Sequence, residues 1–209
     1  MNEPVETTDN AAVPAWMYLS LVGCLGVVHS LCLLNGFVDF DDDSIFLRNP
    51  HFELDWAPFL SWAFDLERPD TWRPLRDLSH YLDLRFHGQA PFWAHLHNLI
   101  LLGITSMLML RFFITTGIEK RLAFVAVLLA FAHPVQVEAI TWVSGRKDLI
   151  AAPLVICTLL VFIRFYKSER AIIQWGMLLG VLSILAVMAK GHVVVIPVVL
   201  FWMYILLGQ

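Results

Sequence analysis

The longest uncharged stretches of this chain constrain its fold most, because they match the thickness of a membrane. Residues 13–34 contain no charged side chain, and His29 is their main ionisable group. A helix needs about 20 apolar residues to cross roughly 30 Å of hydrocarbon, and this stretch meets that length. It exceeds the apolar core of a cleaved signal peptide, and the acidic start MNEPVETTDN lacks the basic residues that precede such a core. We therefore predict a retained membrane anchor.

The overall composition agrees with a lipid environment. Of the 209 residues, 58% are hydrophobic and 15% are charged, whereas about a quarter of a soluble domain is charged. No block of Lys and Arg is present, so no nucleic-acid partner is expected. The three cysteines lie in apolar runs without metal-site spacing and are expected to be small core residues.

Further apolar stretches raise the expected count to about six membrane-spanning helices. These stretches are residues 99–115, 122–143, 149–166 and 171–207. The last is too long for one crossing, so we expect it to fold back at Lys190-Gly191-His192. The second is irregular, because Pro134 removes a backbone donor and breaks the helix. The predicted fold is an all-α polytopic membrane domain over residues 13–209.

Charges beside the short connections predict the orientation. Two connections are flanked by basic residues, namely Arg111, Lys120 and Arg121 at one and Arg164, Lys167 and Arg170 at the other. Short basic loops favour the cytoplasm, so we expect these loops and the tail of residues 1–12 to be cytoplasmic. The long loop of residues 35–94 then lies outside. Its aromatic residues alternate with charges, which predicts interfacial helices near residues 52–64 and 75–86.

An acidic cluster follows the first predicted span, formed by Asp39, Asp41, Asp42 and Asp43. It is either a solvated turn or a functional group of carboxylates. In the functional interpretation, one carboxylate removes a proton from an attacking hydroxyl while a neighbour fixes orientation or binds a cation. A divalent metal held by Asp41 and Asp42 is therefore compatible with the sequence. The spacing alone does not separate a base from a ligand.

A second group of ionisable residues lies in HPVQVEAITWVSGRKD, residues 133–148. A carboxylate such as Glu138 inside an apolar segment is costly unless it is paired or wet, and it predicts an interior cavity. Arg146 and Lys147 suit a phosphate, Arg through its planar fork and Lys as a point charge. They could equally extend toward lipid headgroups. His133 either caps the break in the helix or belongs to the site.

A third group lies in the long loop. Arg73 and Arg76 are three residues apart at a helix start expected at Pro74, so they could clamp an anion together. The alternative is that they pair with the nearby carboxylates of Asp77 and Asp83. His95 and His97 are two residues apart and do not converge on a helix, so no zinc site is expected there.

Four blocks together resemble a known family. They are FVDFDDDSIFLRNPHF, WRPLRDLSHYLD, FAHPVQVEAITWVSGRKDLIA and MAKGHVVVIP, in this order. The chain resembles polytopic membrane proteins that usually carry tetratricopeptide repeats, which include the O-mannosyltransferases of the endoplasmic reticulum and bacterial relatives. Both resemble the GT-C class of glycosyltransferases. This chain has fewer spans than GT-C enzymes generally have and no such repeats, so we expect it to be the N-terminal portion of a longer enzyme.

The resemblance implies a function for these residues. It implies transfer of a hexose such as mannose from a polyprenyl-phosphate donor to an extracytoplasmic protein or lipid acceptor, in a bacterial inner membrane. Asp41 would be the base and Asp42 its neighbour, with Glu138 as a third catalytic candidate. The donor phosphate would be held by Arg146, Lys147, Lys190 and Arg73, with His133 and Asp148 close by.

Two other interpretations remain open from the sequence. The chain could be a non-catalytic membrane module or assembly partner, in which case Asp41→Asn and Asp42→Asn would leave its cellular role intact. It could also be an ion-coupled transporter that uses Glu138, His29, His133 and the broken helix, although no paired repeats are visible.

Overall fold

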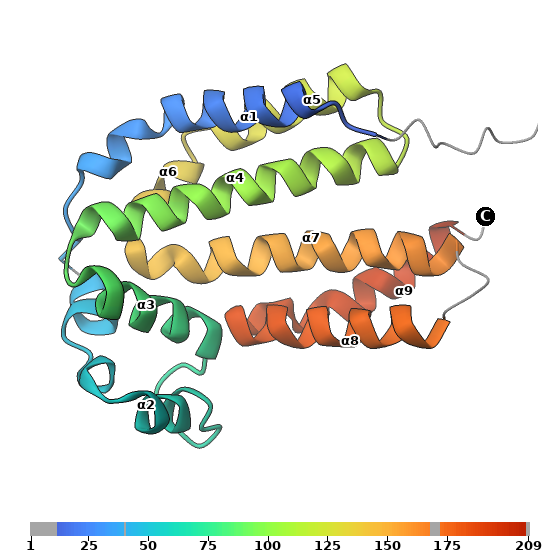
Figure 1. Ribbon diagram of the computed structural model, residues 1–209. Coiled ribbons are helices and arrows are strands. Elements are labelled where there is room, and N and C mark those ends of the chain that lie inside the picture. The colour runs from blue at the N-terminus through green and yellow to red at the C-terminus, as the bar shows by residue number, and fades with distance from the viewer. Residues whose placement is uncertain (1–11, 40, 168–171, 208–209) are drawn as a thin grey trace, which may run out of the picture.

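The structure is a computed structural model, and it describes residues 12–39, 41–167 and 172–207 (Figure 1). In these ranges every regular element is a helix, which confirms the all-α prediction. The α-helices are α1 Ala15–Val28, α2 Trp56–Ala63, α3 Pro74–His87, α4 Pro91–Thr115, α5 Lys120–Ala132, α6 Gln136–Thr141, α7 Arg146–Lys167, α8 Ile172–Ala189 and α9 Ile196–Leu207. Short helices of other types join them, at Ser30–Leu34, Asp42–Leu47, Pro50–Glu53, Val143–Gly145 and Gly191–Val195. The predicted cytoplasmic tail lies outside the described residues, apart from its last position.

Two helical segments of the described chain are long and apolar enough to cross a membrane. They are Pro91–Thr115, with 25 residues, and Val143–Tyr166, with 24. The helices Ala15–Val28, Ile173–Ala189 and Gly191–Leu207 are apolar but shorter.

The long helices run alongside one another and form a bundle with two ends (Figure 1). One half is α1, α4 and α5, whose contact surfaces bury Leu21, Leu25, Leu102, Leu110 and Val127. Helix α7 contacts both α4 and α8, so it joins this half to the C-terminal helices. Both α4 and α7 begin at the end of the bundle that carries α2 and α3 (Figure 1).

The predicted breaks at Pro134 and Lys190 are confirmed. Helix α5 ends at Ala132, and the ring Nδ1 of His133 accepts a hydrogen bond from the Val135 N–H at 3.2 Å. Proline cannot supply the next helical N–H, so the chain turns there and forms the short α6 before α7 begins. Lys190 has extended backbone angles, and it separates α8 from the helical segment that returns along the bundle.

The long loop folds into a compact cap at one end of the bundle. Helices α2 and α3 occupy the two segments for which interfacial helices were predicted. The rings of Phe59 and Tyr81 stack with centroids 3.9 Å apart, and the Tyr81 hydroxyl donates to the Leu54 carbonyl at 2.9 Å. Phe46 and Phe52 are buried in the same cluster. These aromatic contacts fix the cap, and with it the charged residues of the loop.

Candidate functional site

Asp42 joins the acidic segment to the turn that precedes α7. Its side chain is 0% exposed. Its Oδ1 accepts hydrogen bonds from the N–H and the hydroxyl of Ser144, both at 2.7 Å. Its Oδ2 accepts from the N–H groups of Val38 at 3.2 Å and Val143 at 3.3 Å. Hydrogen bonds to a carboxylate are charge-assisted and therefore strong, so they hold two distant parts of the chain together.

Arg146, expected to bind a phosphate, is instead buried among protein acceptors. Its side chain is 0% exposed, and its Nη1 forms an ion pair with Asp83 and donates to the Ser79 hydroxyl at 3.1 Å. Its Nε donates to Asn98 Oδ1 and its Nη2 to the Ala94 carbonyl, both at 2.8 Å. All three nitrogens are thus used within the protein. The guanidinium joins α3, α4 and α7.

Of the two arginines near the start of α3, Arg76 forms an ion pair inside the cap. Arg76 donates through Nε and Nη2 to Asp77 Oδ1 at 2.8 and 2.6 Å, and Arg68 donates to the other oxygen at 2.8 Å. Asp77 is 0% exposed, so these ion pairs belong to the interior of the cap. Arg73 is half-buried at the start of α3. The alternative in which Asp77 pairs with its neighbours therefore applies to Arg76, while Arg73 takes part in a different cluster.

That cluster combines Arg73 with charges from three other parts of the chain. Burial lowers the pKa of the Arg73 guanidinium, and the charge of Arg76 lowers it further. The carboxylates of Asp148, Asp77 and Asp41 oppose this shift, which places Asp41 within electrostatic range of Arg73. Asp41 is half-buried, unlike its buried neighbour in sequence. The acidic segment and the cap therefore meet at a partly accessible position.

Two lysines complete the cluster. The Lys190 ammonium forms an ion pair with Asp148, so the turn after α8 meets the first turn of α7. The Lys147 ammonium donates to the Ser144 carbonyl at 3.3 Å and lies 5.5 Å from the centroid of the Trp142 ring. Lys147 is also within electrostatic range of Arg73 and Lys190. We call Asp41, Arg73, Lys147, Asp148 and Lys190 the end cluster.

A groove of about 430 Å³ adjoins the end cluster. Asp148 and Lys190 contribute the charged part of its lining, and the rest is mainly apolar. The apolar lining comes mainly from α4, α5 and α7, with contributions from α6 and Gly191–Val195, and it includes Leu102, Met109, Phe131, Leu149, Val155 and Ile156. An anionic group and an apolar chain could therefore be accommodated by adjacent parts of one site.

The other predicted site residues lie outside the end cluster. Glu138 is exposed on α6, so the interior cavity expected around it is absent from its position. It is not among the charges that act on Arg73 or Lys147. His133 is exposed and caps the break after α5, as one of its two interpretations predicted.

Sequence reasoning overlooked the residues that hold the site together. Ser144 and Asn98 are buried, and each bonds to a buried charge. The role of Asn98 could have been predicted, because a polar amide near the start of an apolar span requires hydrogen-bond partners inside the protein. Asp83 appeared only as one alternative partner of the loop arginines, whereas it pairs with Arg146.

Two observations bear on the chemistry that the site offers. Within the described ranges, no group of three His, Cys, Asp or Glu side chains is placed to hold a metal ion. His80 is fully buried beside the Phe46 ring, and burial lowers its pKa well below the ordinary value, with further lowering by the charge of Arg146. His80 is therefore neutral and adds no charge near the end cluster.

Asp42→Asn is expected to destabilise the fold by about 1–3 kcal/mol. Three N–H groups and one hydroxyl donate to the carboxylate, and the NH2 group of an amide cannot accept their hydrogen bonds. The free energy of unfolding can be measured by SDS titration in mixed micelles. Asp43→Asn is the matched control, since Asp43 pairs with an exposed Arg48 at the surface and should cost less than about 1 kcal/mol. Equal losses in the two variants would contradict the bridging role of Asp42.

Comparison with known proteins finds relatives that are named protein O-mannosyl-transferases. The mouse Protein O-mannosyl-transferase TMTC1 is 32% identical over 166 residues, which cover 75% of this chain and 17% of the relative. The fruit fly Tmtc3, also named a protein O-mannosyl-transferase, is 32% identical over 178 residues, covering 69% of this chain and 19% of the relative. The mouse TMTC4, which is also named a protein O-mannosyl-transferase, is 28% identical over 183 residues, which cover 74% of this chain and 24% of the relative.

This homology is distant, and the chain spans less than a quarter of the length of these relatives. No protein-family model matches the chain, and no solved structure matches it significantly. The homology and the two long apolar helices together indicate a membrane protein related to glycosyltransferases.

Proposed function

We propose that this chain, a distant homologue of part of the TMTC protein O-mannosyl-transferases, takes part in transferring a hexose from a polyprenyl-phosphate donor to a hydroxyl group. The acceptor would be an extracytoplasmic protein or lipid, and the names of the relatives favour mannose as the sugar. One observation carries the proposal. Asp42 bonds to Ser144, so the acidic segment meets the basic end cluster beside an apolar groove.

In this proposal the bundle crosses the membrane about six times. The crossing elements would be α1 with Ser30–Leu34, α4, α5, α7, α8 and the segment Gly191–Leu207. Their parallel arrangement in Figure 1 supports this count. The basic connections after α4 and after α7 would face the cytoplasm, which puts the cap and the end cluster on the opposite side.

The groove and the end cluster suit the two parts of a lipid-linked donor. The isoprenoid chain would lie in the apolar groove, where it loses contact with water. The phosphate would lie at the end cluster, close to Lys190, Lys147 and Arg73. Cations there would stabilise the negative charge that develops on the departing phosphate. Arg146 would hold the first turn of α7 against α4 through its hydrogen bonds to Asn98 and Ala94, and so keep Lys147 and Asp148 in place.

Asp41 is our candidate for the general base. It would take the proton of the acceptor hydroxyl as that oxygen forms a bond to the anomeric carbon of the sugar. The bond from that carbon to the phosphate oxygen breaks, and the carrier phosphate leaves with the electron pair. Asp42 holds the segment in place through its buried bonds and does not contact the substrates.

The direct test is transfer by the purified intact chain in proteoliposomes. A radiolabelled polyprenyl-phosphate mannose serves as donor and a peptide rich in Ser and Thr serves as acceptor. Transfer of label to the peptide is expected, and it should depend on the donor concentration. Binding of the donor without transfer would contradict catalysis by this chain and would favour the alternative of a non-catalytic module. Uptake of the free sugar or an ion current without transfer would favour a transporter.

A further inference from the structure

A second apolar groove lies between α8 and the helical segment that follows Lys190. Its volume is about 220 Å³. Ile184 and Val187 line it from α8, and Ile196 lines it from the segment that returns along the bundle. Trp72 lines it from the cap, and the next residue in the chain is Arg73 of the end cluster. We call it the second groove, and the groove of about 430 Å³ beside Asp148 and Lys190 the first groove.

The two grooves lie on either side of the short helix Gly191–Val195. Val193 of this helix lines both of them, and its N–H donates to the Lys190 carbonyl at 3.1 Å. The helix between the grooves is thus held to a residue of the end cluster.

Both grooves lead from the end cluster into the bundle in the same direction, because α7 begins and α8 ends at the end that carries the cap (Figure 1). The first groove follows α7 from Asp148 to Ile156, and the second follows α8 back from Lys190 as far as Ser183. At 1.5 Å per residue, each extends roughly 10–12 Å along its helix. Two apolar chains attached to one headgroup could therefore lie side by side.

The charge of the end cluster favours a headgroup with one negative charge. Arg73, Lys147 and Lys190 are cations, whereas Asp41 and Asp148 are carboxylates, so one positive charge is in excess. The positive charges of Arg73 and Lys190 also act on Lys147, and a bound anion would offset that repulsion. The phosphodiester of a phospholipid carries a single negative charge, and its oxygens accept charge-assisted hydrogen bonds from Arg and Lys.

We propose that the end cluster and its two grooves bind a two-chain anionic phospholipid, with the phosphate at the cations and one acyl chain on each side of Gly191–Val195. Each chain would lose contact with water in its groove. A polyprenyl phosphate has a single chain and would fill the first groove alone, so the two lipids would compete for the same phosphate position. That competition rests on the proposed function, whereas binding of the phospholipid does not.

The test measures lipid binding to the purified intact chain in detergent by native mass spectrometry. The probes are dioctanoyl phosphatidylglycerol, dioctanoyl phosphatidylcholine and hexadecanoyl lysophosphatidylglycerol. The first and the third have the same headgroup and the same total number of chain carbons, and they differ in whether those carbons form two chains or one. Dioctanoyl phosphatidylglycerol is expected to bind at least about tenfold more tightly than either of the others, because it alone matches both the charge and the two grooves. Equal affinity of the unmodified chain for the two phosphatidylglycerols would overturn the proposal.

One pair of variants tests the second groove. Ser183→Phe places a ring in that groove and should lower the affinity for dioctanoyl phosphatidylglycerol to that for the one-chain lipid, whose own affinity stays unchanged. Val181→Phe is the matched control, because Val181 is 52% exposed on the same helix and does not line the groove. A two-chain preference that survives Ser183→Phe, or that is lost equally in Val181→Phe, would contradict the proposal.

A second pair tests the headgroup. Lys190→Gln removes one cation of the end cluster and should weaken both phosphatidylglycerols at least about tenfold, since a charge-assisted hydrogen bond is lost, while phosphatidylcholine is unaffected. Arg85→Gln is the control, because Arg85 belongs to the cap but pairs with the exposed Asp55. Equal losses in these two variants would indicate general attraction to basic residues and would overturn the assignment.

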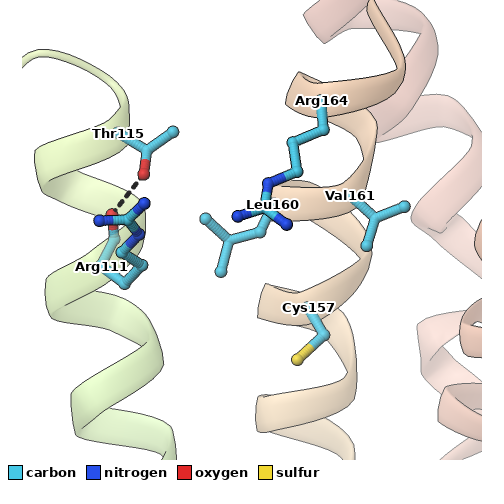
Figure 2. A pocket seen from close by; sticks show the side chains of 6 residues that line it. All are labelled: Arg111, Thr115, Cys157, Leu160, Val161 and Arg164. Atoms are coloured by element: carbon cyan, nitrogen blue, oxygen red, sulfur yellow. Dashed lines mark hydrogen bonds between the residues drawn. The ribbon is translucent and has the colours of Figure 1, made fainter. Parts of the chain in front are cut away.

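A pocket farther along α4 and α7 provides a control for the location (Figure 2). Leu160 lines it and lies 12 positions after Asp148, roughly 18 Å along α7. Leu160→Phe should therefore leave phosphatidylglycerol binding unchanged. A loss as large as that in Ser183→Phe would place the lipid elsewhere and overturn the proposal.

The outcome for transfer is separate. If the chain transfers mannose, added phosphatidylglycerol should raise the KM for the polyprenyl-phosphate donor and leave kcat unchanged. A chain that shows the two-chain preference but no transfer supports this inference and contradicts the proposed function. A chain that transfers but binds the one-chain and two-chain lipids equally supports the proposed function and contradicts this inference.

Discussion

Asp41→Asn is expected to lower hexose transfer by about 10²–10⁴-fold, the usual contribution of a general base. The amide keeps the size of the side chain but cannot accept the hydroxyl proton at neutral pH. Asp41 is the half-buried member of the acidic segment that lies within electrostatic range of Arg73, so its replacement acts where acceptor and donor would meet. Initial rates with the radiolabelled donor measure the effect.

Asp39→Asn provides the matched control for this prediction. Asp39 is exposed, and it carries the same charge two positions earlier in the same segment. Its replacement should change the rate by no more than a few fold, and the Tm of both variants should stay close to that of the unmodified chain. If both variants transfer at the normal rate, Asp41 is not the base. If both are inactive, the charge of the whole segment matters and no single carboxylate is singled out.

Arg146→Met is expected to destabilise the fold by about 3–5 kcal/mol, because it leaves the buried carboxylate of Asp83 without its arginine. It also removes the donors that bond to Asn98 and to the Ala94 carbonyl. The free energy of unfolding in mixed micelles measures the loss. Adding Asp83→Asn to Arg146→Met should restore part of it, because it removes the charge of a buried carboxylate that has lost its arginine and keeps the 2.6 Å hydrogen bond with the His97 ring.

Arg85→Gln is the control for this second prediction. Arg85 pairs with Asp55 at 3.3 Å, and the side chain of Asp55 is 91% exposed. This pair should contribute less than about 1 kcal/mol. The sequence interpretation of Arg146 predicts a different result, in which stability is unchanged and only the KM for the lipid donor rises. The two outcomes separate a positioning residue from a phosphate ligand.

The fold class and the main breaks in the helices could be predicted because they follow from local chemistry. Long uncharged runs specify apolar helices. Pro134 lacks a backbone N–H, and helix α5 ends two residues before it. The aromatic residues of the long loop marked the positions of α2 and α3 for a similar reason. These signals are contained within short stretches of sequence, so no knowledge of distant contacts was needed.

The roles within the candidate site depend on distant contacts and were harder to predict. Asp41 and Asp42 are adjacent and chemically identical, yet only Asp42 reaches Ser144 and is buried. Arg146 and Lys147 are likewise adjacent, but successive side chains on a helix point about 100° apart. One therefore enters the interior beside Asn98, while the other stays half-exposed. Sequence spacing alone does not reveal which member of each pair turns inward.

The bridge made by Asp42 also has a consequence for biogenesis. Its partner Ser144 follows 102 positions later in the chain, so a ribosome must synthesise the five intervening helices α2 to α6 with their loops before this carboxylate gains the donors of Val143 and Ser144. Until then Asp42 must remain hydrated, because an unpaired carboxylate is too costly to bury. Closure of the cap is thus a late event of membrane insertion, and nascent chains that stop before Ser144 should leave the acidic segment open to protease.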